Sequence, residues 1–160
     1  LIQKHRRTYS TYWAWSDRVE TQTMLGNPLA AARGWQITEH GIYANARSIR
    51  NFPLQANGAE LLRIACIKIV RAKIKLCAPI HDAVLIEDTV DRIQDTSVRC
   101  QQIMEDASRE LLNGFRIRTD VEITKYPDRF GEENPIFDML LGTVSGGKGA
   151  CSADSRCMLR

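Results

Sequence analysis

The chain has 160 residues, of which 44% are hydrophobic and 26% are charged, and its formal net charge is +3. This length and composition are ordinary for one globular domain with its own core, and the small net charge does not by itself predict binding to nucleic acid. The sequence contains no apolar run that approaches the length of a membrane span and no signal-peptide pattern at its start.

Residues 1–25 have the spacing of a helix with mixed faces. Its aromatic positions are Tyr9, Tyr12, Trp13 and Trp15. Rings at helical spacing favour packing into a core, but they can also form a platform on which bases stack. The basic side chains of Lys4, His5, Arg6 and Arg7 fit either a solvated face or contact with a template phosphate.

Residues 26–45 are rich in turn signals. Gly26-Asn27-Pro28 is expected to end the first helix, because proline removes a donor and restricts the residue before it. Residues 35–38 and 41–43 predict a small hairpin, with His40 in its turn.

A second helix is expected to begin near Arg47, with Pro53 causing a kink or a break over residues 51–55. A break would direct the amides of Asn51 and Gln55 sideways. Amides both donate and accept hydrogen bonds, which suits the minor groove of a duplex. Alternatively, Asn51 caps the following turn and Gln55 is merely exposed.

Residues 57–72 are largely apolar and predict a buried helix. Asn57 is a candidate N-cap, with Glu60 as its capping-box partner, which gives Glu60 a structural role.

Two short apolar runs, residues 74–80 and 83–86, flank the pair His81-Asp82 and predict a hairpin. A carboxylate among apolar strands costs free energy unless a cation or hydrogen bonds receive it. Asp82 is therefore the best candidate for chemistry in the chain. The alternative is a structural role, since aspartate is a common turn residue.

A helix is expected from Asp88 or Thr89 to Asn113, followed by a strand over residues 116–124. Its apolar face would hold Val90, Ile93, Cys100, Met104, Ala107 and Leu111. Its solvated face would hold Asp91, Arg92, Arg99, Glu105 and Arg109. Residues 132–141 predict one short helix, and the Gly/Ser-rich residues 143–160 predict disorder.

Several motifs occur together in a characteristic order. They are Arg47, then Asn51-x-Pro53-x-Gln55, then Ala59-Glu60-Leu61-Leu62-Arg63-x-Ala65, then His81-Asp82. In order and spacing they resemble the C-terminal palm of a family A DNA polymerase, the DNA polymerase I type, over residues 30–130. The sequence departs from that family at residues 56–58, where the family usually has Gly-Thr-Ala, and at Ala83, where the family has a metal-site glutamate.

The resemblance implies an α+β fold in which a small antiparallel palm sheet, with a catalytic-type hairpin, packs against long helices. It implies three parts: a helical segment leading from the fingers (residues 1–25), a palm portion (26–130), and a short helix with a disordered tail (131–160).

The resemblance also implies template-dependent nucleotidyl transfer to a primer 3′-hydroxyl, assisted by two Mg²⁺ ions. Asp82 would be one bridging carboxylate, and His81 would position the hairpin or the primer. The side chains of Arg47, Asn51 and Gln55 would contact the duplex. The expected partners are primer-template DNA, deoxynucleoside triphosphates and the rest of a polymerase chain, without a membrane, in the cytoplasm.

The sequence contains no Asp-Tyr-Ser-type motif for the second bridging carboxylate and no Lys-rich fingers helix, and it begins at Leu1. We therefore expect a fragment that does not catalyse alone. One alternative is a non-catalytic nucleic-acid-binding module derived from a palm, which Ala83 favours. The other is an α+β domain whose match is fortuitous.

Overall fold

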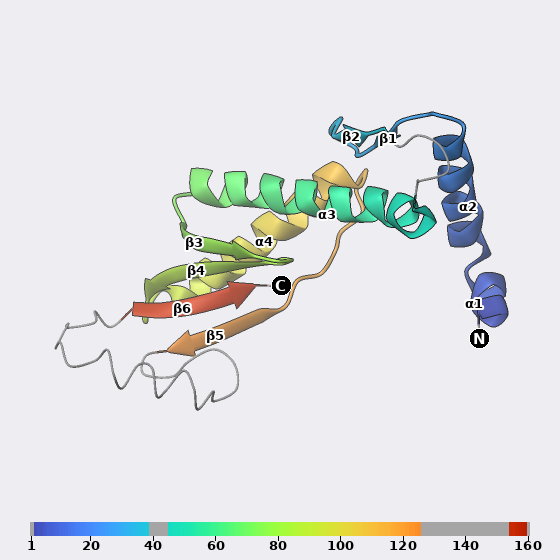
Figure 1. The fold of residues 1–160 in the computed structure, drawn as a ribbon. Coiled ribbons are helices and arrows are strands. Elements are labelled where there is room, and N and C mark those ends of the chain that lie inside the picture. Colours follow the sequence, from blue (N-terminus) through green and yellow to red (C-terminus); the bar gives the residue numbers. More distant parts are fainter. Residues whose placement is uncertain (1, 39–44, 126–153, 160) are drawn as a thin grey trace, which may run out of the picture. The chain divides into compact units, whose positions relative to one another are not determined.

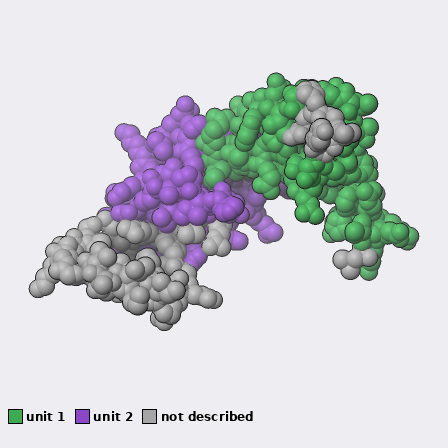
Figure 2. Space-filling view, viewed as in Figure 1, with its two compact units in different colours: residues 1–63 green, residues 64–160 purple. Residues whose placement is uncertain are grey.

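The computed structural model describes residues 2–38, 45–125 and 154–159. The chain divides into two compact units, Leu1–Arg63 and Ile64–Arg160, which are coloured separately in Figure 2. Helix α3 (Ala46–Arg71) begins in the first unit and ends in the second. The described residues form helices and two small antiparallel sheets, so the predicted α+β class is confirmed. None of the described helices has the length and apolar character that crossing a membrane requires.

The first unit starts with two helices, α1 (Ile2–Thr8) and α2 (Ser10–Met24), where one helix over residues 1–25 was predicted. They meet at Tyr9, whose backbone angles, φ −114° and ψ 50°, are not helical. Helical hydrogen bonds nevertheless continue on both sides: the Tyr9 N–H donates to His5 at 2.9 Å, and Trp13 donates to Tyr9 at 3.1 Å. The prediction is therefore confirmed, apart from the interruption at Tyr9.

A two-stranded sheet follows, formed by β1 (Leu29–Ala30) and β2 (Gln36–Ile37). Helix α2 ends at Met24, before Gly26, as predicted. Between the strands, Gly34 has a φ of +86°, which a residue without a Cβ adopts readily. The predicted hairpin had a different pairing; its residues 41–43 and His40 lie outside the described residues.

Helix α3 runs without a break through Pro53, so the predicted interruption over residues 51–55 is wrong. Proline's fixed φ is compatible with a helix, and the missing N–H forfeits one hydrogen bond. The helix buries Ile49 and Ala56 on either side of Pro53, and this burial opposes the cost of the proline. The C-terminal half was expected to be buried all round; it buries Ile64, Ala65 and Ile69 but exposes Ile67 and Val70.

The second unit contains a four-stranded antiparallel sheet in the order β3-β4-β6-β5 (Figure 1). The strands are β3 (Lys75–Ile80), β4 (Ala83–Thr89), β5 (Val121–Lys125) and β6 (Asp154–Leu159). Helix α4 (Ile93–Leu111) contacts β4, β5 and β6. The predicted hairpin is thus confirmed, with β4 extending to Thr89.

Helix α4 begins at Ile93, later than predicted, because Asp88 and Thr89 still belong to β4. Its apolar face is confirmed except for Val90, which precedes the helix and is exposed. The helix buries Ile93, Cys100, Met104, Ala107 and Leu111. Its end is also confirmed: Gly114, at a φ of +93°, donates its N–H to the Arg109 carbonyl at 2.8 Å.

Two expectations for this unit need correction. Glu105 was placed on a solvated face, but it is buried and forms an ion pair with Arg116, which removes the cost of an unpaired buried charge. The tail was expected to be disordered, but residues 154–159 form β6, hydrogen-bonded to strands on both sides. The predicted short helix at residues 132–141, and the tail up to residue 153, lie outside the described residues.

Candidate functional site

The three residues expected to contact a duplex lie on one face of α3. Arg47, Asn51 and Gln55 are each four residues apart in a continuous helix, so their side chains form a single row, here called the α3 row. All three are exposed. Their side chains form no hydrogen bond or ion pair with any other described residue, so the row is open to a ligand.

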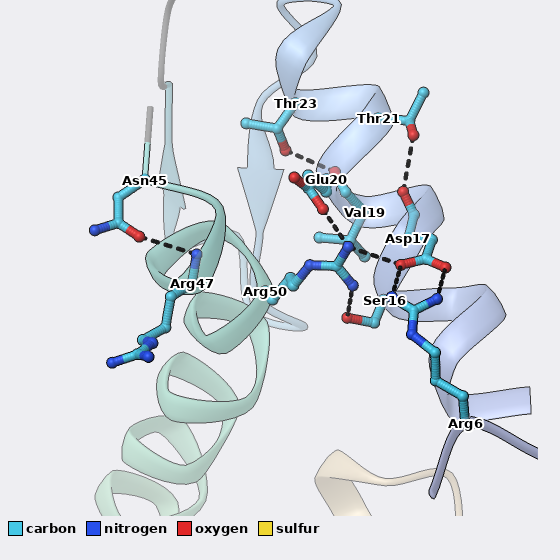
Figure 3. A network of polar contacts seen from close by, with 10 residues as sticks. All are labelled: Arg6, Ser16, Asp17, Val19, Glu20, Thr21, Thr23, Asn45, Arg47 and Arg50. Carbon is cyan, nitrogen blue, oxygen red and sulfur yellow. Dashed lines mark hydrogen bonds and ion pairs between the residues drawn. The ribbon is translucent and has the colours of Figure 1, made fainter. Parts of the chain in front are cut away.

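Arg50, one turn along from Arg47, points to a different part of the first unit (Figure 3). Its guanidinium donates a hydrogen bond to Ser16 Oγ at 2.8 Å, and it forms ion pairs with Asp17, at 2.7 Å, and Glu20. Only 22% of the Arg50 side chain is exposed. These contacts join the first turns of α3 to α2 and so fix the direction in which the α3 row faces.

Asp17 is shared between two arginines, because Arg6 also binds its carboxylate at 3.1 Å. The hydrogen bond from Arg50, reinforced by Arg6, holds the pKa of Asp17 below its ordinary value of 3.8. The carboxylate is therefore ionised at neutral pH. Sequence reasoning missed this network, since nothing in the local pattern distinguishes Arg50 from the exposed Arg47.

The start of α3 is fixed by Asn45. Its side-chain oxygen accepts hydrogen bonds from the backbone N–H groups of Arg47, at 2.9 Å, and Ser48, at 3.4 Å. The predicted N-cap at Asn57 is wrong, because Asn57 lies inside the helix; its side-chain oxygen instead accepts a hydrogen bond from the Ala32 N–H at 2.9 Å. The capping-box role predicted for Glu60 is wrong for the same reason; Glu60 instead forms an ion pair with Arg63 at 2.5 Å.

The hairpin of the second unit presents Asp82 at its tip. Ile80 pairs with Ala83, which leaves His81 and Asp82 as a two-residue turn. His81 has a φ of +58°, in the left-handed region that such tight turns require. Asp82 and His81 are both exposed, so the expected desolvation of the Asp82 carboxylate does not occur. Neither side chain forms a hydrogen bond or ion pair with another described residue.

The acidic residues nearest along β4 are already engaged. Glu87 forms an ion pair with Lys75 at 2.8 Å. Asp88 lies six strand residues from Asp82, which corresponds to about 20 Å at about 3.3 Å per residue. Neither carboxylate is therefore placed to share an ion with Asp82.

Asp88 forms a separate polar cluster where β4 meets α4. Its carboxylate accepts hydrogen bonds from Thr96 Oγ1 at 2.7 Å, the Thr89 N–H at 2.8 Å and the Arg92 guanidinium at 2.7 Å. The Thr96 hydroxyl is the main cause that lowers the pKa of Asp88, followed by the Thr89 N–H and the charge of Arg92. An open cavity of about 270 Å³ lies beside it, lined by Lys73, Lys75, Glu87, Asp88, Thr89 and Arg92.

The magnesium site that the resemblance implies needs paired carboxylates. Among residues 2–38, 45–125 and 154–159, no group of three or more histidine, cysteine, aspartate or glutamate side chains is arranged to hold a metal ion. The described residues therefore supply one carboxylate, Asp82, and do not by themselves fit a two-metal centre.

No protein-family model, curated protein or solved structure matches the chain. The case for a function therefore rests on the motifs of the sequence and on the geometry of the α3 row and the hairpin.

Proposed function

We propose that this chain is the palm portion of a DNA-templated DNA polymerase of family A, and that it holds the primer-template duplex through the α3 row. The observation that carries the proposal is the row itself. Arg47, Asn51 and Gln55 lie on one exposed face of one helix, and their side chains form no hydrogen bond or ion pair with other described residues.

The spacing of the row suits a duplex. Residues four apart in a helix are separated by about 6 Å along its axis. Two base-pair steps of a duplex cover about 6.8 Å. Because α3 is continuous, its three side chains have a spacing close to that of every second base pair.

The chemistry of the row also suits a polymerase. Amides of Asn51 and Gln55 can donate to the minor-groove acceptors that A·T and G·C pairs share, and Arg47 can bind phosphate or the same acceptors. Such contacts do not depend on base sequence. A polymerase needs this property, because it must hold any correctly paired primer end.

In this proposal Asp82 contributes one carboxylate to a catalytic centre, and His81 positions the hairpin or the primer. Since the described residues do not complete that centre, we expect the isolated chain to bind duplex DNA without extending a primer. Template-directed incorporation of nucleotides by the isolated chain would contradict this part of the proposal.

The test is fluorescence anisotropy with a labelled primer-template duplex at several salt concentrations. We expect Asn51→Ala and Gln55→Ala each to weaken binding about tenfold with little change in salt dependence. Arg47→Ala is expected to weaken binding and to reduce the salt slope by about 1, if Arg47 binds a phosphate. Duplexes of different sequence should bind equally well.

Matched controls come from the exposed face of α4. Arg99→Ala and Gln102→Ala remove the same side-chain types from α4 positions that are also exposed. If these variants lose as much affinity as the α3 row variants, binding is non-specific and the proposal fails. It also fails if the unchanged chain does not bind the duplex.

A second candidate, a non-catalytic nucleic-acid-binding module, is favoured by Ala83. This residue stands where the family has glutamate, and it is only 2% exposed, so the site is built for a small apolar side chain. The reading frame upstream of Leu1 distinguishes the two candidates. An in-frame Asp-containing strand motif with a Lys-bearing helix supports the polymerase, and a start codon close to Leu1 supports the binding module.

A further inference from the structure

Five ring side chains form a connected series along α1 and α2, here called the aromatic ladder. It runs in the order Tyr9, His5, Trp13, Tyr12 and Trp15. The successive ring centroids lie 4.7, 6.1, 5.7 and 5.8 Å apart, in tilted or edge-to-face arrangements. These are the separations at which aromatic rings attract one another.

Polar contacts hold the ladder in place. Trp13 Nε1 donates a hydrogen bond to His5 Nδ1 at 3.0 Å, which fixes the two rings relative to each other. The Arg6 guanidinium lies 4.2 Å from the centre of the Trp13 ring while it binds Asp17. A surface ordered in this way can receive a ligand with little further loss of side-chain entropy.

Three rings of the ladder, those of His5, Tyr9 and Tyr12, are exposed to solvent. Tyr9 is 55% exposed and Tyr12 is 39% exposed. Packing of these aromatic residues into a core, which their helical spacing favoured, is therefore wrong for Tyr9 and Tyr12. The tyrosines face outward because α1 and α2 are joined at a bend and bury few side chains: α1 buries none, and α2 buries Ser16 and Thr23.

The part of the ladder in α1 lies on a basic helix. Helix α1 contains no acidic residue, and Lys4 and Arg7, three positions apart, are exposed on one side of it. Neither forms an ion pair with any residue of the described ranges. Exposed rings in a segment that also carries such cations are a combination that binds single-stranded nucleic acid, in which the bases stack on the rings and the cations contact the phosphates.

We propose that the aromatic ladder, together with Lys4 and Arg7, binds single-stranded nucleic acid. Unpaired bases are required, because paired bases in a duplex do not offer their faces for stacking. This site is separate from the α3 row, and the inference does not rest on the proposed polymerase function.

The test is anisotropy of a labelled oligothymidylate with the full chain. The double variant Tyr9→Ala, Tyr12→Ala is expected to bind about tenfold or more weakly, whereas Tyr9→Phe, Tyr12→Phe keeps both rings and binds like the unchanged chain. Lys4→Ala and Arg7→Ala are each expected to reduce the salt slope by about 0.7. Far-UV circular dichroism checks that each variant keeps its helices.

Asn51→Ala, Gln55→Ala serves as the cross-control: it should weaken binding to a blunt duplex and leave oligothymidylate binding unchanged. If the unchanged chain binds oligothymidylate but not the duplex, the proposed function is contradicted and the present inference is not. The inference is overturned if the folded Tyr→Ala double variant binds the oligonucleotide as well as the unchanged chain does, or if the unchanged chain does not bind it. It is also overturned if sedimentation shows that the tyrosines instead join two copies of the chain.

Discussion

The guanidinium of Arg50 lies 2.7 Å from the carboxylate of Asp17, and this ion pair joins the start of α3 to α2 (Figure 3). Arg47 lies in the same turn of α3, but its side chain forms no hydrogen bond or ion pair with the described residues. Two arginines three positions apart therefore have different tasks: one holds the helix in place, and the other is open to a ligand.

Arg50→Ala is expected to lower the free energy of unfolding by about 1–2 kcal/mol, because Ser16, Asp17 and Glu20 all lose a partner. Arg50→Lys should lose less, since it keeps the charge but not the fork of donors. Urea denaturation measures both. Arg99→Ala, at an exposed position, is the control; equal stability of Arg50→Ala and this control would contradict the structural role of Arg50.

Thr96→Val is expected to lower the stability at neutral pH and to make that stability less dependent on acid, because it removes the hydroxyl that does most to lower the pKa of Asp88. An aspartate with a lowered pKa in the folded state binds fewer protons folded than unfolded. Its stabilisation is therefore present above about pH 3.8 and is lost as the pH falls through the lower folded value.

Stability measured by urea at a series of pH values, from about pH 6 to about pH 2, checks this expectation. Between these limits the Thr96→Val chain should lose less stability than the unchanged chain, because the folded pKa of its Asp88 lies nearer the unfolded value. Thr96→Ser keeps a hydroxyl and is expected to retain the original profile. Identical acid profiles for the valine and serine variants would show that the Thr96 hydroxyl does not control Asp88.

Asn45→Ala is expected to cost about 1 kcal/mol of stability, because the N–H groups of Arg47 and Ser48 lose their cap. Asn45→Ser, which keeps a capping oxygen, should restore most of the loss. If α3 instead began near Asn57, Asn45→Ala would have no effect; thermal unfolding followed by circular dichroism separates the two cases.

Ala83→Glu introduces the residue that family A polymerases have at the position that resembles Ala83, yet we expect it to destabilise this chain by about 2–3 kcal/mol. The site is 2% exposed, and a carboxylate there would lose water without gaining a partner among the described residues. Ala83→Ser is the matched control of similar size. Denaturation midpoints provide the measurement, and an Ala83→Glu chain as stable as the serine variant would contradict the expectation.

Sequence reasoning succeeded where the determining pattern is local. The 3.6-residue periodicity from Ile93 to Leu111 identified the buried face of α4, and two apolar runs around His81-Asp82 identified the hairpin. It failed at Pro53, because the local cost of a proline inside a helix was outweighed by the burial of Ile49 and Ala56 on either side of it. The start of α3 at Ala46 agrees with the helix expected near Arg47, whereas the local capping signal at Asn57 wrongly predicted a second helix start inside it.

The missed parts of the candidate site depend on residues far apart in the chain. Arg50 and Ser16 are separated by 34 positions, and nothing near either residue signals the other. Glu105 looks like an ordinary surface glutamate until Arg116 is brought beside it. The exposure of Tyr9 and Tyr12 depends on how little of α1 and α2 is covered, which helical spacing does not report.

Strand β6 has a consequence for biosynthesis. Residues 154–159 form the only strand that joins β4 to β5 in the described sheet order, so neither pairing can form until this last stretch has been made. While the ribosome is still adding residues 126–153, the β3–β4 hairpin carries an unpaired edge, which is open to wrong partners.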